Sequence, residues 1–314
     1  MFVPAYQQTN PETNRAAAPR PHENGVVLID KPPAWTSHDV VNRWRKLAGA
    51  KRAGHLGTLD PMATGLLVLV TGRATRLAQF YVKEEKGYLA EITTGVVSDT
   101  YDADGQVVAV TENLPSDAII AEALNQFKGR FWQVPPPVSA KKIDGVRAYK
   151  LARKQIPVEL KSVEVEVKRL EIRSVSHGKI SALIECSSGT YIRSIAHDLG
   201  QRLGCGALLS GLRRVTVGEF KLDQARTMEE IRELAALDRL AEVVIPPSAL
   251  LGNMPAAYFD SAGEARIRSG NDFRTSPFVV PPGAPLVRAL SHSGDLIAIG
   301  ELKIPNLYHP GTVL

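Results

Sequence analysis

A short glycine-rich segment, residues 54–65 (GHLGTLDPMATG), combines residue types that can do chemistry. It holds three glycines, the imidazole of His55, the carboxylate of Asp60, and a proline directly after that aspartate. The proline disfavours helical geometry at Asp60, and glycines let a backbone approach a ligand closely. The segment predicts a loop that presents a carboxylate into a cleft. The same residues would also suit a plain turn in which Asp60 caps backbone groups.

Two other kinds of site fit the sequence poorly. A phosphate-binding P-loop needs GK[ST] after its glycines, and that triplet does not follow here. The two cysteines, Cys186 and Cys205, and the seven histidines show no CxxC or HExxH spacing. We therefore expect no metal site. Two thiols are too few to stabilise a chain of this length through disulfide bonds, so a reducing, cytoplasmic compartment fits best.

A second candidate lies between Phe127 and Lys154, where eight basic residues accompany a single acid, Asp144. Aromatic residues are interleaved with the basic ones. Positive charge attracts phosphates, and aromatic rings can stack on unpaired bases, so the stretch indicates nucleic-acid binding. An ordinary solvated loop is the alternative. From residue 245 onward five basic and five acidic residues cancel, so the net charge of +5 lies in the first 244 residues.

Hydrophobic spacing and turn residues predict the elements that must hold these segments. Ser37 is expected to cap a helix that ends at Gly49, and Thr190 to open one that stops at Gly204. The triple proline at 135–137 excludes regular structure there, so residues 133–160 are expected to form a long excursion. Strands are expected over 25–30, 66–70, 86–94, 163–167 and 179–186, and further helices over 116–127 and 227–237.

Length and composition place these elements in a globular chain. With 314 residues, of which 44% are hydrophobic and 23% charged, about two domains are expected. No apolar run approaches the roughly 18 residues of a membrane span, and no signal-peptide core is present. We expect a disordered tail over 1–22, an α+β body over 23–250, and a small all-β unit over 251–314.

The segment around Asp60 resembles the catalytic-aspartate motif of the TruB family of bacterial tRNA pseudouridine synthases. Further blocks follow in family order. They are Asp30-Lys31-Pro32, Lys86-Gly87-Tyr88, the run 98–105 (SDTYDADG), the start of an RNA-inserting loop at 133–141, the run 186–194 (CSSGTYIRS) and Leu212-Arg213-Arg214. Two residues depart from the usual pattern, Ser98 in place of threonine and Tyr101 in place of serine or threonine. The resemblance spans roughly residues 25–214, and only loosely reaches the C-terminal unit.

The resemblance implies a pseudouridine synthase-type catalytic domain with a central mixed or antiparallel sheet, followed by a PUA-like domain. It implies that uridine 55 in the T-loop of tRNA becomes pseudouridine without a cofactor. Asp60 would act as nucleophile or counter-charge, with attack on ribose C1′ or on uracil C6 left open. Arg193 would be its cationic partner, since an isolated buried carboxylate tends to protonate.

Other roles follow from the same resemblance. Tyr88 would stack on the flipped uracil and assist loss of the C5 proton, while Tyr191 and Leu212 would complete the pocket. His55 would occupy the gap left by the extruded base. Lys31 and Pro32 would support the pocket. The RNA-binding loop would supply Lys141, Lys142, Arg147, Lys150 and Arg153.

The expected partner is therefore the T-arm of tRNA, with no membrane and no obligatory protein partner. Two alternatives remain at this point. A guide-RNA-dependent relative would share the aspartate motif but would use a longer C-terminal region than this one. A non-catalytic tRNA-binding or folding protein would not need Asp60, Tyr88 and Arg193 together.

Overall fold

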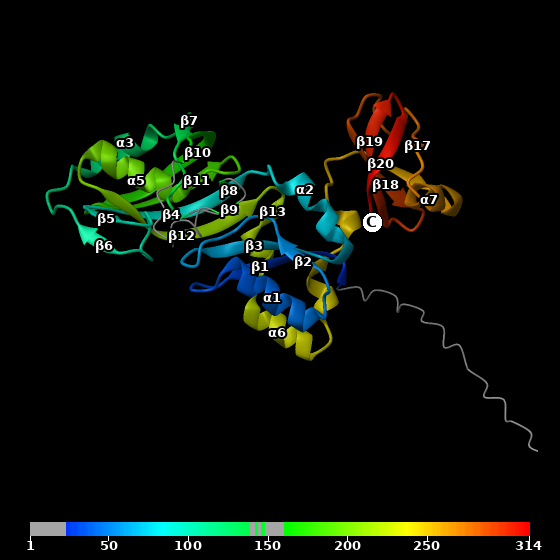
Figure 1. Ribbon diagram of the computed structural model, residues 1–314, viewed down its shortest axis with the longest axis horizontal. Helices are drawn as coiled ribbons and strands as arrows, with labels where there is room; N and C mark the ends of the chain where they lie inside the picture. The colour runs from blue at the N-terminus through cyan, green and yellow to red at the C-terminus, as the bar shows by residue number, and fades with distance from the viewer. Residues whose placement is uncertain (1–22, 139–141, 144–145, 148–159) are drawn as a thin grey trace, which may run out of the picture.

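The computed structural model describes residues 23–138, 142–143, 146–147 and 160–314 (Figure 1). A large mixed sheet forms the body, and a five-stranded sheet forms a separate C-terminal unit. The expected tail over 1–22 and most of the loop over 133–160 lie outside the described residues. Among the residues described, no helix is both long enough and apolar enough to cross a membrane.

The large sheet brings distant parts of the sequence side by side. Its spatial order is β14 (Arg226–Thr227), β1 (Gly25–Lys31), β3 (Thr64–Thr71), β12 (Ala207–Val217), β4 (Lys86–Thr94), β11 (Lys179–Cys186), β10 (Val163–Ser176) and β7 (Gly129–Gln133). Three short strands pair at its sides, β2 (Ala53–His55), β13 (Phe220–Lys221) and β15 (Val244–Ile245). The β1–β14 and β3–β12 pairs are parallel, whereas the other pairs along the path are antiparallel. The sheet is therefore mixed, as expected.

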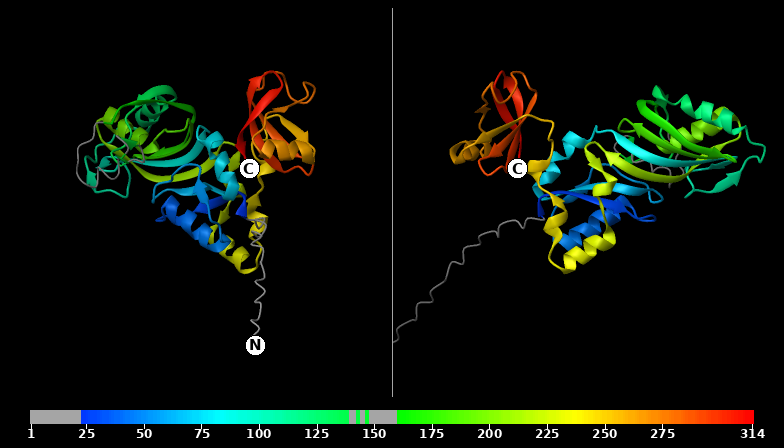
Figure 2. Two further views of the ribbon diagram at one scale, coloured as in Figure 1. Left: turned by 45° about the vertical axis from the view of Figure 1, so that its right-hand side comes forward. Right: turned by 180° about the vertical axis from the view of Figure 1, so that it is seen from behind.

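Helices cover one face of this sheet at its two ends. At one end lie α1 (Ser37–Ala48) and α6 (Met228–Ala236), and at the other α3 (Asp117–Asn125) and α5 (Ile192–Leu203) (Figures 1 and 2). Alternate strand residues such as Val27, Leu67 and Ile92 pack against them in one continuous core. Burial of these apolar faces is what fixes the strand register, since a one-residue slip would turn them to the other face.

The helix ends follow the sequence with two corrections. The helix expected to open at Thr190 begins at Ile192, with Tyr191 as its N-cap and no side-chain cap. Gly49 and Gly204 end their helices in the left-handed conformation, as expected. The predicted cap at Ser37 is wrong, because Thr36 caps α1 in a reciprocal box with Asp39. Ser37 is buried instead, and its hydroxyl bonds a loop that lies 22 residues further on. A local sequence pattern cannot reveal a hydrogen-bond partner that lies so far along the chain.

The C-terminal unit packs onto the other face of the large sheet. Its strands are β16 (Ala256–Phe259), β18 (Leu286–Ser291), β19 (Leu296–Ile304), β20 (Leu307–Val313) and β17 (Phe273–Arg274), and it also carries one helix, α7 (Ser261–Arg268). Leu290, Ile299 and Leu314 from this unit share a buried cluster with Leu28 and Val68 of the body. Figures 1 and 2 show the unit beside α2 (Ala78–Tyr81), away from α3 and α5.

Candidate active site

The loop that carries Asp60 runs between β2 and β3 and is anchored on both sides of the aspartate. Ser37 accepts a hydrogen bond from the Leu59 amide at 2.8 Å, and its hydroxyl lies 3.0 Å from the Leu59 carbonyl. On the other side, the Ala34 amide donates to the Pro61 carbonyl at 3.0 Å. Asp60 is thus held by residues of α1 and the turn before it.

Lys31 supports the same loop from the end of β1. Its side chain is fully buried, and its ammonium donates to the carbonyls of Pro32 (2.9 Å), Trp35 (2.6 Å) and Pro61 (3.1 Å). Burial lowers the pKa of Lys31 to about 8. An ammonium whose three protons are held by carbonyls ties β1, the following turn and the aspartate loop together.

Arg193, on the first turn of α5, meets Asp60 through two contacts. Its Nε lies 3.0 Å from Oδ2 of Asp60, and its Nη2 lies 3.2 Å from Oδ1. The arginine is only 4% exposed, whereas the Asp60 side chain keeps 35% of its surface open. Burial raises the pKa of Asp60, and the Arg193 guanidinium opposes that rise. Arg193 therefore contacts the carboxylate on its buried side, and the other side of the carboxylate remains exposed.

A second carboxylate that the sequence reading missed also faces Arg193. Oδ2 of Asp102 lies 3.3 Å from Nη1 of Arg193, and both side chains are about 5% exposed. The other Asp102 oxygen accepts from the Thr100 hydroxyl at 2.6 Å and from the Asp104 amide at 3.1 Å. One arginine thus bridges two aspartates. The repeated acids in the run 98–105 were the available signal, but local spacing does not show which of them turns inward.

The turn that carries Asp102 is itself pinned to neighbouring elements. The Thr100 carbonyl accepts from Nη1 of Arg193 at 3.0 Å. The Tyr101 ring stacks on the His197 ring of α5, with centroids 3.7 Å apart and planes 9° apart. Tyr101 adopts a left-handed backbone, with φ at 66°, which is unfavourable for a bulky residue. The stack and the arginine together hold this turn against α5.

Tyr88 lies in β4, directly opposite Arg214 of β12. The tyrosine is 8% exposed and the arginine 1% exposed. Arg214 also donates to the carbonyls of Leu66 at 2.8 Å, Gly57 at 3.1 Å and Thr58 at 3.4 Å. Burial raises the pKa of Tyr88, which the Arg214 charge opposes. Sequence reading placed Arg214 in a closing segment without seeing its contact with the aspartate loop.

Comparison with known proteins shows the family of this chain. The family profile described as TruB family pseudouridylate synthase (N terminal domain) matches residues 45–192, and that of the tRNA pseudouridylate synthase B C-terminal domain matches residues 193–251. A protein named tRNA pseudouridine synthase B from Solibacter usitatus is 50% identical over 93% of this chain and 100% of its own. Its namesake from Geobacter sulfurreducens is 42% identical over 79% of this chain and 82% of its own.

The chain belongs to the TruB family of pseudouridylate synthases. Enzymes of this family isomerise uridine in tRNA to pseudouridine. A chain from a solved H/ACA ribonucleoprotein, bound to a substrate RNA containing 2′-deoxyuridine, shares the fold with a TM-score of 0.69 at 22% identity, over 93% of this chain and 86% of that one. The predicted family and fold class are therefore confirmed.

The remaining predicted site residues of this TruB-family enzyme belong to elements that adjoin the Asp60 loop or Arg193: β2 before the loop, the residue before α5, and β12, which pairs with β3. His55 ends β2, where it pairs with Leu69 of β3, and it is half-buried. Tyr191 precedes α5, and its backbone exchanges two hydrogen bonds with the buried Gln133 side chain, at 2.8 and 3.1 Å. Leu212 lies in β12 and packs against the core beside Ala90.

The predicted RNA-binding loop is only partly described. Lys141, Lys150 and Arg153 lie outside the described residues. Lys142 and Arg147 belong to a two-stranded hairpin of β8 (Lys142–Ile143) and β9 (Val146–Arg147), where their backbones pair. The base of the loop reaches the site, because the Val138 carbonyl accepts from Nη2 of Arg193 at 2.9 Å.

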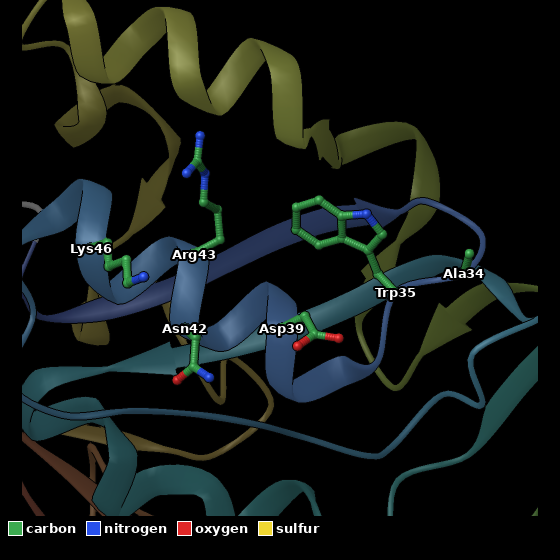
Figure 3. Close-up of a pocket in the computed structure, with 6 residues that line it drawn as sticks. All are labelled: Ala34, Trp35, Asp39, Asn42, Arg43 and Lys46. Carbon is green, nitrogen blue, oxygen red and sulfur yellow. The ribbon is translucent and has the colours of Figure 1, made fainter.

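A pocket of about 470 Å³ lies beside the site rather than in it. It is lined by Trp35, Arg43 and Lys46 together with Ala34, Asp39 and Asn42, all from α1 and the turn before it (Figure 3). None of the groups that contact Asp60 lines it. Across the described ranges, no cluster of histidine, cysteine and acidic side chains is suited to hold a metal ion.

Proposed function

We propose that this enzyme acts on uridine 55 in the T-arm of tRNA. The observation that carries the proposal is the Asp60–Arg193–Asp102 cluster, in which a half-open carboxylate is backed by a buried guanidinium. The likeness to proteins named tRNA pseudouridine synthase B supports tRNA as the substrate. The T-loop position follows from the motif resemblance around Asp60.

In this proposal Asp60 performs the first step from its open side. The reaction must detach uracil at N1 and rejoin it at C5, so one group must trap or stabilise the separated fragment. An ionised Asp60 does this either as a nucleophile or as a counter-charge to the ribose. Arg193 keeps Asp60 ionised and aimed, and Asp102 in turn fixes Arg193.

The uracil itself would lie against Tyr88, with Tyr191 and Leu212 completing the pocket. Chemistry on a base inside a folded loop requires the nucleotide to leave the stack. His55, five residues before Asp60 on β2, would fill the vacated space. The basic residues predicted in the loop from 133 to 160 would contact phosphates of the RNA.

We further propose that the C-terminal unit is a PUA-like RNA-binding domain and that the domains divide near residue 250. It would contact tRNA away from the T-loop, without chemistry of its own and without an obligatory protein partner. We also propose a cytoplasmic location, which agrees with a tRNA substrate and with the free thiols of Cys186 and Cys205.

Tritium release from tRNA labelled at uridine C5 tests the proposal. Wild-type enzyme should release tritium from whole tRNA, and Asp60→Asn should release none above background. Asp223→Asn is the matched control, since Asp223 is an exposed residue outside the site. A tRNA with cytidine at position 55 should give no release. Release that persists with this tRNA would refute the position, and release that persists in Asp60→Asn would refute the role of the aspartate.

A further inference from the structure

The turn that carries Asp102 is fastened to α5 at two places. Nη1 of Arg193, on the first turn of α5, lies 3.0 Å from the Thr100 carbonyl and 3.3 Å from the Asp102 carboxylate. His197 lies one helical turn further along on the same face, and its ring stacks on the ring of Tyr101. Three consecutive residues of the turn thus meet two residues of one helix face.

The stack is close and nearly parallel. The ring centroids of Tyr101 and His197 are 3.7 Å apart, and the ring planes differ by 9°. Burial lowers the pKa of His197 more than the charge of Asp198 raises it, so the imidazole is uncharged at neutral pH. The contact therefore joins two uncharged aromatic faces, not a cation and a ring. A flat ring of another type should serve at either position.

The backbone of Tyr101 is held in a costly shape. Its φ is 66°, in the left-handed region that bulky side chains avoid. Two backbone bonds hold the turn on β12: the Leu209 amide donates to the Tyr101 carbonyl at 3.0 Å, and the Ala103 amide donates to the Leu209 carbonyl at 3.1 Å. These bonds do not involve α5. The side of the turn that faces α5 is held by the ring stack and by Arg193.

Two contacts one helical turn apart fix a direction as well as a distance. A turn bound to α5 through Arg193 alone could pivot about the guanidinium, whereas a second contact about 6 Å along the helix axis prevents that rotation. The direction matters because the guanidinium is shared. Its Nη1 holds the turn, while its Nε and Nη2 face the two oxygens of Asp60 at 3.0 and 3.2 Å. A pivot of the turn would carry the planar guanidinium away from Asp60.

We propose that Tyr101 and His197 are positioning residues for the step that Asp60 performs. Their stack sets the direction of the Asp102 turn, the turn sets the plane of the Arg193 guanidinium, and the guanidinium aims the Asp60 carboxylate. This inference rests on the proposed role of Asp60 and extends it to a pair of aromatic rings. Tyr101 stands where the family pattern usually has serine or threonine, so the stack is an addition to the usual motif.

Single-turnover pseudouridine formation at saturating tRNA tests the pair, with tRNA binding measured separately by filter retention. Tyr101→Ala and His197→Ala should each slow the reaction by about 3- to 10-fold, the range set by losing one stacked ring pair, and should leave affinity unchanged. Tyr101→Phe and His197→Phe keep a flat ring and should retain the wild-type rate. Tyr101→Asn tolerates the left-handed backbone but lacks an aromatic ring, so it should be as slow as Tyr101→Ala.

A double-mutant cycle separates positioning from general support of the fold. Because the stack acts through the guanidinium, Tyr101→Ala should not slow Arg193→Met further, and the two losses should not multiply. His177→Ala is the matched control, since His177 also has a positive φ, 49°, but is exposed in the turn between β10 and β11. It should leave the rate unchanged. Unfolding in urea is followed for every variant, so that rates are compared among folded proteins.

The outcomes distinguish this inference from the proposed function. Losses that multiply in the double variant, phenylalanine variants as slow as the alanine variants, or alanine variants at the wild-type rate would each overturn the positioning role. Tyr101→Asn at the wild-type rate would assign the effect to the backbone and would overturn it as well. Activity that persists in Asp60→Asn, or wild-type inactivity on tRNA, would refute the proposed function instead.

Discussion

Removing the Arg193 guanidinium should abolish most turnover while leaving tRNA affinity largely intact. Arg193→Met keeps an apolar stem of similar length but removes every donor. In the folded protein those donors reach Asp60, Asp102 and two backbone carbonyls, from a side chain that is 4% exposed. The substitution thus leaves two carboxylates facing each other without a cation between them.

The size of the loss can be worked out from the burial of the pair. Breaking a buried ion pair by removing one partner costs about 3–5 kcal/mol. The Asp60 side chain is 35% exposed, so water replaces part of the lost interaction and the lower end, about 3 kcal/mol, applies. At 1.36 kcal/mol for each factor of ten, kcat should fall about 150-fold.

The pH dependence of kcat gives the decisive readout. Burial raises the pKa of Asp60, and Arg193 opposes that rise, so its removal should raise the pKa further. In the proposed mechanism the ionised Asp60 carboxylate is the active form, so activity should be lost as pH falls through its pKa. The acid-side loss of activity should therefore move to higher pH in Arg193→Met, and alkaline buffer should restore part of the rate.

The assay is single-turnover pseudouridine formation at saturating tRNA, with binding measured separately by filter retention. Arg193→Lys should lie between wild type and Arg193→Met, because it keeps a charge but loses the two-point contact. Arg239→Met removes an exposed arginine that pairs with Glu242, and it should leave kcat unchanged. A loss of less than tenfold, or a larger loss with no shift in the pH profile, would contradict the reasoning.

Three further tests, two of them with a comparison variant, probe how the fold is held together. Ser37→Ala should lower the free energy of unfolding in urea by about 1–3 kcal/mol and slow turnover, because it strips the Leu59 amide of its buried acceptor beside Asp60. Thr36→Ala should cost about 1 kcal/mol through the helix cap and leave the rate unchanged; equal rates for the two variants would contradict this. Tyr81→Phe should lower the free energy of unfolding in urea by about 1–2 kcal/mol, because the Tyr81 hydroxyl bonds Glu219 at 2.6 Å and the Leu251 amide at 3.1 Å. Tyr258→Phe should leave the free energy of unfolding unchanged, because Tyr258 is 66% exposed. Gly65→Ala should lower the thermal midpoint by the equivalent of about 2 kcal/mol or more, because its Cβ would lie 2.4 Å from the Arg214 carbonyl at a φ of 93°; an unchanged midpoint would show that β3 and β12 can separate there.

The structure also changes what truncation of the C-terminal unit would mean. From charge and motif content alone, this unit is expected to be a separate appendage to the α+β body. In the folded chain its Leu290, Ile299 and Leu314 share a buried cluster with β1 and β3 of the body. Removing the unit would expose this cluster, which lies on the opposite face of the strands that flank the aspartate loop. A truncated chain would therefore test folding before it tested RNA binding.

Much of the local structure follows from sequence because its causes are local. Gly49 and Gly204 end helices since left-handed backbone costs glycine least, and Thr227 with Glu230 forms the expected capping box. Alternating apolar residues place β4 and β11 correctly. The aspartate motif can also be recognised from the sequence, because a glycine-rich loop with Asp60 before a proline is a contiguous pattern.

Tertiary structure alone decided which distant groups meet. Asp102 lies 91 positions before Arg193, and Arg214 lies more than a hundred positions after Tyr88. Local spacing carries no information about such pairs, because burial and sheet register bring them together only in the folded chain. The sequence by itself indicated most of the elements and the family, and it led to the proposal that Asp60 is the reacting carboxylate. The packed sheet decided that one arginine bridges two aspartates and that another lies against the tyrosine, since only a closed, water-poor interior makes those pairings strong.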